Sequence, residues 1–188
     1  MKKFLSPLCG LFSMLSTQAQ TPTAAPPTSR LSAEVNILWP IFPGNLYNGK
    51  VLYNLRPGTD RPSAMYLGFN VRPQEFREDE GDWSNWEALV GYRHYFTSRI
   101  NFDAQAGFGQ GTLKKSVVDG RDYQSFDVEV GAFLGYKLPL GGKRVKPYIN
   151  LQPLGVLYVA YQSEKHPIVG QSSEKPIYAG AVQFGLRF

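Results

Sequence analysis

Histidines beside hydroxyl and carboxyl groups are the first candidates for catalysis, and the chain has two, His94 and His166. A histidine on a strand activates a serine only when the two share a face, two residues apart. Neither histidine has a serine at that spacing. Ser163, Glu164 and His166 form a looser set in a polar segment, which we interpret as a solvated loop. We therefore predict no catalytic residues and a protein that is not an enzyme.

Carboxylates gather in the segment from Glu75 to Asp82, and hard divalent cations prefer such oxygen ligands. The spacing matches no calcium-loop pattern, so we interpret the segment as an exposed acidic loop, with a Ca²⁺ or Mg²⁺ site as the alternative. The sequence contains no glycine-rich phosphate loop, zinc pattern or redox motif. We expect no cofactor and no bound metal.

Composition excludes several classes of protein. The chain has 188 residues, of which 43% are hydrophobic and 19% charged, so neither a disordered chain nor a coiled coil is expected. No run reaches the roughly 18 apolar residues of a membrane-spanning helix. The formal charge of +5 is dispersed along the chain, which argues against nucleic acid as a partner.

The N-terminus resembles a targeting segment rather than part of the fold. Lys2 and Lys3 precede an apolar stretch that ends in small residues, which predicts a signal peptide over residues 1–19. Cys9, the only cysteine, would leave with it, and Leu8 before it argues against a lipid anchor. Residues 20–30 are rich in proline and are expected to form a flexible tail. The folded domain is predicted to span residues 31–188.

From Leu31 onward, apolar residues alternate with polar or small ones, the period of a strand with one apolar face. Turn signals divide this region into eight expected strands, at 31–39, 48–57, 63–73, 84–96, 99–111, 122–138, 146–161 and 175–188. The connections alternate between short turns and longer, more polar loops. An even number of strands with this alternation is typical of an up-and-down outer-membrane barrel whose N-terminus is periplasmic.

Aromatic residues give an independent estimate of strand length. On three expected strands, two aromatics on the apolar face lie ten residues apart, which spans roughly 23 Å for a tilted strand and approximates an outer-membrane core. The predicted aromatic girdle is Trp86, Phe96, Phe126, Tyr136, Tyr178 and Phe188. A soluble sandwich or lipocalin-like barrel is the alternative, because it has the same alternation with the apolar face turned inward.

The terminal run from Tyr178 to Phe188, together with the signal peptide and eight alternating strands, resembles the small outer-membrane barrels of the OmpA/OmpX type. The resemblance is one of architecture and covers residues 31–188. It implies an all-β, eight-stranded antiparallel transmembrane barrel in the bacterial outer membrane. It also implies that Phe184, Leu186 and Phe188 are read by the barrel-assembly machinery, and that outer-membrane lipids and lipopolysaccharide are partners. A divalent cation at the acidic loop would then bridge to lipopolysaccharide phosphate.

If the apolar face meets lipid, the other face lines a narrow lumen in which unpaired charge is costly. Its five expected cations are matched by five carboxylates. The predicted lumen network is Glu34, Arg56, Arg72, Glu87, Arg93, Asp103, Asp127, Glu129, Lys137 and Arg187. Glycines on the same face would make room for these side chains. We expect paired side chains to close the lumen, with a narrow solute channel as the alternative.

The expected function is that of a non-enzymatic barrel that stabilises the envelope or presents loops for adhesion or ligand binding; the sequence does not identify the surface ligand. Related small barrels include enzymes that deacylate or acylate lipid A. A lipid A-modifying enzyme with an unusual site is therefore the second hypothesis.

Overall fold

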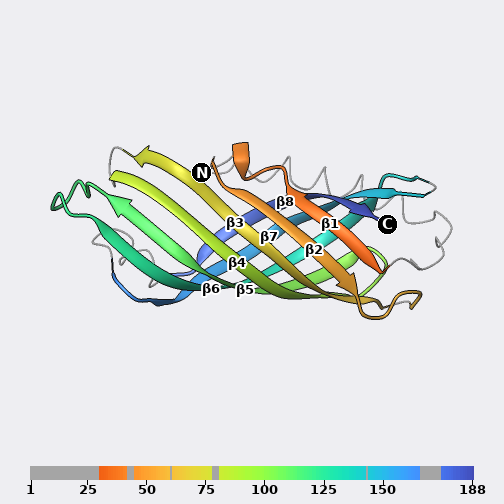
Figure 1. Cartoon of the computed structure of the whole chain (residues 1–188). Coiled ribbons are helices and arrows are strands. Elements are labelled where there is room, and N and C mark those ends of the chain that lie inside the picture. The colour runs from red at the N-terminus through yellow and green to blue at the C-terminus, as the bar shows by residue number, and fades with distance from the viewer. Residues whose placement is uncertain (1–29, 42–44, 60, 78–80, 143, 166–174) are drawn as a thin grey trace, which may run out of the picture.

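The computed structural model describes residues 30–41, 45–59, 61–77, 81–142, 144–165 and 175–188. Its regular elements are eight β-strands that form one closed antiparallel barrel in sequence order (Figure 1). Within the described residues, no helix is long and apolar enough to cross a membrane. The strands are β1 (Leu31–Asn36), β2 (Tyr47–Asn54), β3 (Ser63–Arg77), β4 (Gly81–Tyr95), β5 (Ile100–Lys114), β6 (Tyr123–Pro139), β7 (Lys146–Gln162) and β8 (Ile177–Arg187).

The eight strands and their order confirm the predicted all-β up-and-down barrel. The connections β2–β3, β4–β5 and β6–β7 meet at one end of the barrel, which we call the short-turn end. It lies on the right in Figure 1, together with the C-terminus. The connections β3–β4, β5–β6 and β7–β8 lie at the opposite end, which we call the long-loop end.

Closure of the barrel involves a stagger between strands. From Glu34 on β1, paired residues lead through β2, β3, β4 and β5 to Glu129 on β6. In the other direction, pairs through β8 and β7 lead to Pro139 on the same strand, so the offset is 139 − 129 = 10 residues. A stagger of this kind tilts strands by roughly 35–45° and sets the width of a barrel. With eight strands, the interior has room for little more than side chains.

The interior of the barrel is polar and its outer wall is apolar. Arg93, Asp103 and Asn150 are fully buried, whereas the side chains of Leu67 and Leu154 are 69% and 66% exposed. The strand period causes this division, because alternate residues point to opposite faces. The distribution is the reverse of that in a soluble lipocalin-like barrel, where the apolar face fills the interior.

Two predicted strands end earlier than expected. β1 stops at Asn36 and β2 at Asn54, whereas the sequence predicted ends near 39 and 57. The side chain of Asn36 accepts hydrogen bonds from the backbone N–H groups of Leu38 (2.9 Å) and Trp39 (3.1 Å), which turns the chain out of the strand. β3, β4 and β5 are longer than predicted, because the sheet continues into the connecting segments, whereas β6 has the predicted length.

Strand β7 does not keep one alternation along its length. Its register against β8 shifts between Gln152 and Gly155, at a bulge that contains Pro153 and Leu154. Proline has no N–H to donate to the sheet and is commonly placed at such bulges. Gln152 therefore points inward before the bulge, whereas after it Gly155 is buried and Leu157 and Val159 are half-buried.

Trp39 closes part of the interior near the long-loop end. It is 5% exposed and packs with Phe133 of β6 and Ala181 of β8. Its indole Nε1 donates a hydrogen bond to the carbonyl of Gly180 (2.7 Å). Because β1 ends at Asn36, this part of β8 has no β1 neighbour, and the Trp39 side chain covers it instead.

Candidate functional site

An ion-pair cluster lies at the centre of the barrel, formed by Arg93, Glu34, Asp103 and Lys50. The guanidinium of Arg93 contacts Glu34 through Nη1–Oε1 (2.5 Å) and Nη2–Oε2 (2.8 Å). Its Nη2 also lies 2.7 Å from Asp103 Oδ2. All three side chains have no exposed surface. The cluster thus joins β1, β4 and β5 across the interior.

Lys50 of β2 completes the cluster. Its Nζ lies 3.7 Å from Asp103 Oδ2 and donates a hydrogen bond to Gln105 Oε1 (3.2 Å). The ammonium also stands over the ring of Tyr66, 4.7 Å from its centroid. With Lys50 included, two cations face two carboxylates, which is the balance that buried charge requires.

Neutral side chains add hydrogen bonds to two of the carboxylate oxygens that Arg93 already contacts. Tyr148 donates its hydroxyl to Glu34 Oε1 (2.8 Å), and Gln152 donates to Asp103 Oδ2 (3.0 Å). Both residues belong to β7, so the network reaches strands on opposite sides of the barrel. Such hydrogen bonds offset part of the cost of removing the carboxylates from water.

The predicted lumen residues do not all join this cluster. Glu87, Asp127 and Glu129 lie toward the long-loop end, where Asn70 donates to Glu87 Oε2 (2.9 Å) and Ser125 donates to Asp127 Oδ1 (2.8 Å). Arg72 also lies at this end of its strand, and its side chain is half-buried. No group of three or more potential metal ligands occurs in the described part of the chain.

Lys137 and Arg187 occupy the short-turn end of the lumen. The Lys137 ammonium lies 3.9 Å from the centroid of the Tyr148 ring and 5.3 Å from that of Tyr95. The Arg187 guanidinium lies 5.8 Å from the same Tyr148 ring. Outside the Arg93 cluster, three carboxylates and Arg72 therefore lie toward the long loops, and the cations Lys137 and Arg187 lie toward the short turns.

Arg56 is not part of the interior, contrary to its expected place in the lumen network. It lies in the turn after β2 and is exposed. The predicted strand ran three residues too far, which placed Arg56 on the inward face. Lys50 supplies the fifth cation instead. Its place could be deduced from the sequence, because Lys50 and Asn54 are even-numbered residues of one strand and share a face.

The candidate catalytic groups that the structure describes lie on separate elements, His94 on β4 and Ser163 and Glu164 after β7. His94 lies on the outer face of β4, where its ring makes an edge contact with Phe96 at 5.2 Å. The Ser163 hydroxyl accepts a hydrogen bond from the backbone N–H of Phe126 (2.7 Å), and Glu164 accepts one from that of Gln124 (3.1 Å). His166 lies outside the described residues, as do residues 78–80 of the expected acidic loop at 75–82. The other residues of that segment belong to the ends of β3 and β4 rather than to a loop.

The six predicted girdle residues lie on the outer wall. Trp86, Phe96, Phe126, Tyr178 and Phe188 are exposed by about half or more, and Tyr136 is half-buried. Tyr136 accepts a hydrogen bond from Arg99 (3.0 Å).

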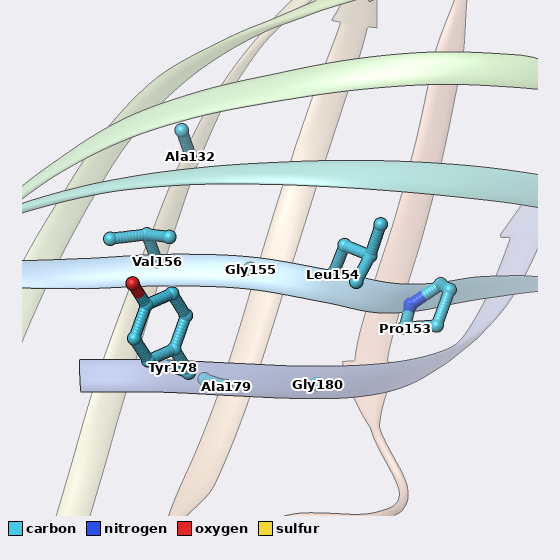
Figure 2. A pocket seen from close by; sticks show the side chains of 8 residues that line it. All are labelled: Ala132, Pro153, Leu154, Gly155, Val156, Tyr178, Ala179 and Gly180. Carbon is cyan, nitrogen blue, oxygen red and sulfur yellow. The ribbon is translucent and has the colours of Figure 1, made fainter. Parts of the chain in front are cut away.

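An apolar groove of about 410 Å³ opens on the outer wall at the β7 bulge, lined by Ala132, Pro153, Leu154, Gly155, Val156, Tyr178, Ala179 and Gly180 (Figure 2). Small residues and the bulge create it. The Tyr178 hydroxyl is the only polar side-chain group of this lining. The groove therefore contains no nucleophile paired with a base and offers surface for packing rather than a catalytic site.

Compared with known proteins, the chain matches no protein-family model, no curated protein and no solved structure.

Proposed function

We propose that the chain is a non-enzymatic barrel of a bacterial outer membrane, of the OmpA/OmpX type, with a lumen closed by side chains. The observation that carries this proposal is the reversed distribution of polarity. Side chains such as Val51, Leu67 and Leu154 are more than half exposed on the wall, and ion pairs fill the interior. In water this wall would expose far more apolar surface than a soluble monomer tolerates, whereas lipid would cover it at little cost.

The outer aromatics support the same placement. Trp86 on β4 and Phe96 directly after β4 stand ten residues apart, as do Phe126 and Tyr136 on β6. In a membrane they would lie at the two interfaces, where aromatic rings are enriched. The wall between them would span roughly 23 Å of hydrocarbon, by the rise and tilt of a barrel strand.

The proposed role is mechanical or adhesive rather than transport. The Arg93 cluster crosses the lumen of a barrel that has only eight strands. Such an interior is filled by side chains and leaves no wide aqueous path. The long loops would then face the cell exterior and be the parts available for envelope contacts or ligand binding.

Cell fractionation and gel migration test the location. The unboiled protein folded in detergent should migrate differently from the boiled protein, and the cellular protein should be recovered with the outer membrane. Recovery mainly from the soluble periplasm would contradict the proposal.

Two further measurements test the role. Planar bilayers should show no stable, large conductance steps. Lipid A mass spectra should be the same with and without the protein. A lipid A mass shift that disappears in the His166→Ala variant would replace this proposal with the enzyme hypothesis.

A further inference from the structure

Basic side chains form a ring around the short-turn end of the barrel. Arg56 and Arg61 belong to the β2–β3 turn, Arg99 to the β4–β5 turn, and Arg144 to the β6–β7 turn, which Lys146 follows at the start of β7. Arg30 directly precedes β1. Because the strand order is sequential and closed, these positions recur at every second strand around the rim. Five of the six side chains are exposed, and Arg99 is half-buried.

The ring has no acidic counterpart in the described residues of this end. The described parts of the three turns contain no aspartate or glutamate. Asp60 of the first turn lies outside the described residues. The long-loop end is different. Its β5–β6 loop alternates cations with Asp119 and Asp122, and Glu164 precedes Lys165 after β7. The excess of positive charge therefore belongs to one end of the molecule.

Two of the arginines are tied to tyrosines of the outer wall. Arg30 Nη1 donates to the hydroxyl of Tyr53 (3.2 Å), and Arg99 Nη1 donates to that of Tyr136 (3.0 Å). A tyrosine with an apolar ring and a polar tip suits the edge of a hydrocarbon layer. An arginine bonded to that tip places its charge just beyond the edge, at the depth of lipid phosphates.

We propose that this basic rim binds the phosphate groups of anionic phospholipids in the leaflet that surrounds the short-turn end. The proposal rests on the membrane location proposed above. The cations are spread around the circumference rather than gathered in one pocket. This arrangement favours binding of many lipid headgroups at the same depth in the membrane. Basic residues beside an anionic leaflet attract its lipids. The rim would fix the depth of the barrel and enrich acidic lipids around it.

The test compares lipids that remain bound to the folded protein. The wild-type protein is folded into vesicles of equal parts phosphatidylglycerol and phosphatidylcholine, released in mild detergent, and weighed by native mass spectrometry. We expect several-fold more phosphatidylglycerol than phosphatidylcholine to be retained. Equal retention of the two lipids would overturn the proposal.

A matched pair of variants locates the binding end. The rim variant carries Arg56→Gln, Arg61→Gln, Arg144→Gln and Lys146→Gln, which neutralises four exposed cations. The control variant carries Lys114→Gln, Lys115→Gln, Arg121→Gln and Lys175→Gln at the long-loop end. The preference for phosphatidylglycerol should vanish in the rim variant and persist in the control. Loss of the preference in both variants would show general charge attraction and overturn the proposal.

Added inorganic phosphate distinguishes lipid from free phosphate. An excess should leave the lipid preference intact at constant ionic strength, because no single cluster of the rim encloses one phosphate. Loss of the preference would indicate a free-phosphate site instead. Failure of the unboiled protein to shift on a gel would count against the membrane barrel itself, whereas a normal shift without lipid preference would count only against the rim.

Discussion

Arg93 on β4 and Glu34 on β1, 59 residues apart in sequence, face each other through two hydrogen bonds in the fully buried centre of the barrel. The pair spans strands that are not neighbours in the sheet, so it ties opposite parts of the wall together. Because Arg93 also binds Asp103, removing the arginine would leave two carboxylates without their main partner.

Arg93→Ala should therefore lower the free energy of unfolding by about 3–5 kcal/mol, the usual cost of breaking a buried ion pair. The midpoint of urea unfolding in detergent or vesicles measures it. Val130→Ala on the outer wall is the control and should cost much less, because its side chain leaves lipid rather than water. Equal, small shifts in both variants would refute the assignment of inside and outside.

A double-mutant cycle measures the pair directly. Glu34→Gln and Arg93→Gln should each destabilise the protein, and the double variant should cost less than the sum of the two. Residues in one buried network commonly show coupling of about 0.5–3 kcal/mol. Additive effects would mean that the two side chains act independently.

Lys50 and Arg56 are close in sequence, but their substitution should affect the stability of the protein very differently. Lys50→Met removes a buried cation from Asp103 and should lower the free energy of unfolding by about 1–3 kcal/mol. Arg56→Met changes an exposed turn residue and should stay within about 0.5 kcal/mol. Urea midpoints of the two variants decide the matter. A larger effect at Arg56 would support its predicted place in the lumen network.

These two residues show what the sequence could and could not predict. The period of two identifies eight strands and their inward faces, because every strand must divide polar from apolar surroundings along its length. It does not define where a strand stops, since an end depends on local hydrogen bonds such as those accepted by Asn36. A strand that ends at residue 57 rather than at Asn54 would place Arg56 in the lumen, which is the reason that this prediction is wrong.

The pairing of charged side chains inside the lumen also could not be predicted from the sequence. A balance of charges follows from the cost of burial, but the partner of each charge depends on register and stagger, which bring Glu34 to Arg93. The bulge at Pro153 reverses the alternation within β7. Trp39 covers the inner side of β8 only because β1 is short. The buried rings of Tyr66, Tyr95 and Tyr148 are not part of the predicted lumen network, because that prediction rests on the balance of charged side chains alone.

Gly185 is required by the ring of Tyr148. A Cβ at Gly185 would lie 2.2 Å from Tyr148 Cζ, so the ring that bonds Glu34 would have to move. Gly185→Ala should cost about 1–3 kcal/mol, as overpacking of a tight core does. Gly180→Ala on the same strand is the control, because its nearest neighbour would be 3.5 Å away, an ordinary contact. Thermal unfolding of both variants tests the difference, and equal stability of the two would contradict it.

Asp119 in the β5–β6 loop should titrate at unusually low pH. The hydroxyl of Tyr123 and the backbone N–H of Arg121 donate to its carboxylate, and these bonds lower the pKa of Asp119 below its ordinary value of 3.8. A lowered folded-state pKa stabilises the loop above the ordinary pKa, and this contribution is lost as the pH falls through the lowered one. Protection of the Arg121 amide should therefore persist at pH 5 and fall only in stronger acid.

The carboxyl resonance of Asp119 in a pH titration measures this pKa. Tyr123→Phe removes the hydroxyl and should return the pKa of Asp119 toward 3.8. An ordinary value in the wild-type protein, or no change in the variant, would show that the loop does not hold these bonds in solution.

Trp39 should control the order of the segment that follows β1. Trp39→Ala removes its packing on Phe133 and Ala181 together with the hydrogen bond to Gly180, and should cost about 3–5 kcal/mol. Trp39→Phe keeps an aromatic ring and loses the N–H, so it should cost about 1–2 kcal/mol. Hydrogen exchange should rise at Leu38 and along Ile177–Ala181 in the alanine variant, because that part of β8 has no β1 strand beside it. If exchange rises equally in β4 and β5, Trp39 supports the barrel as a whole and the proposed local cover is wrong.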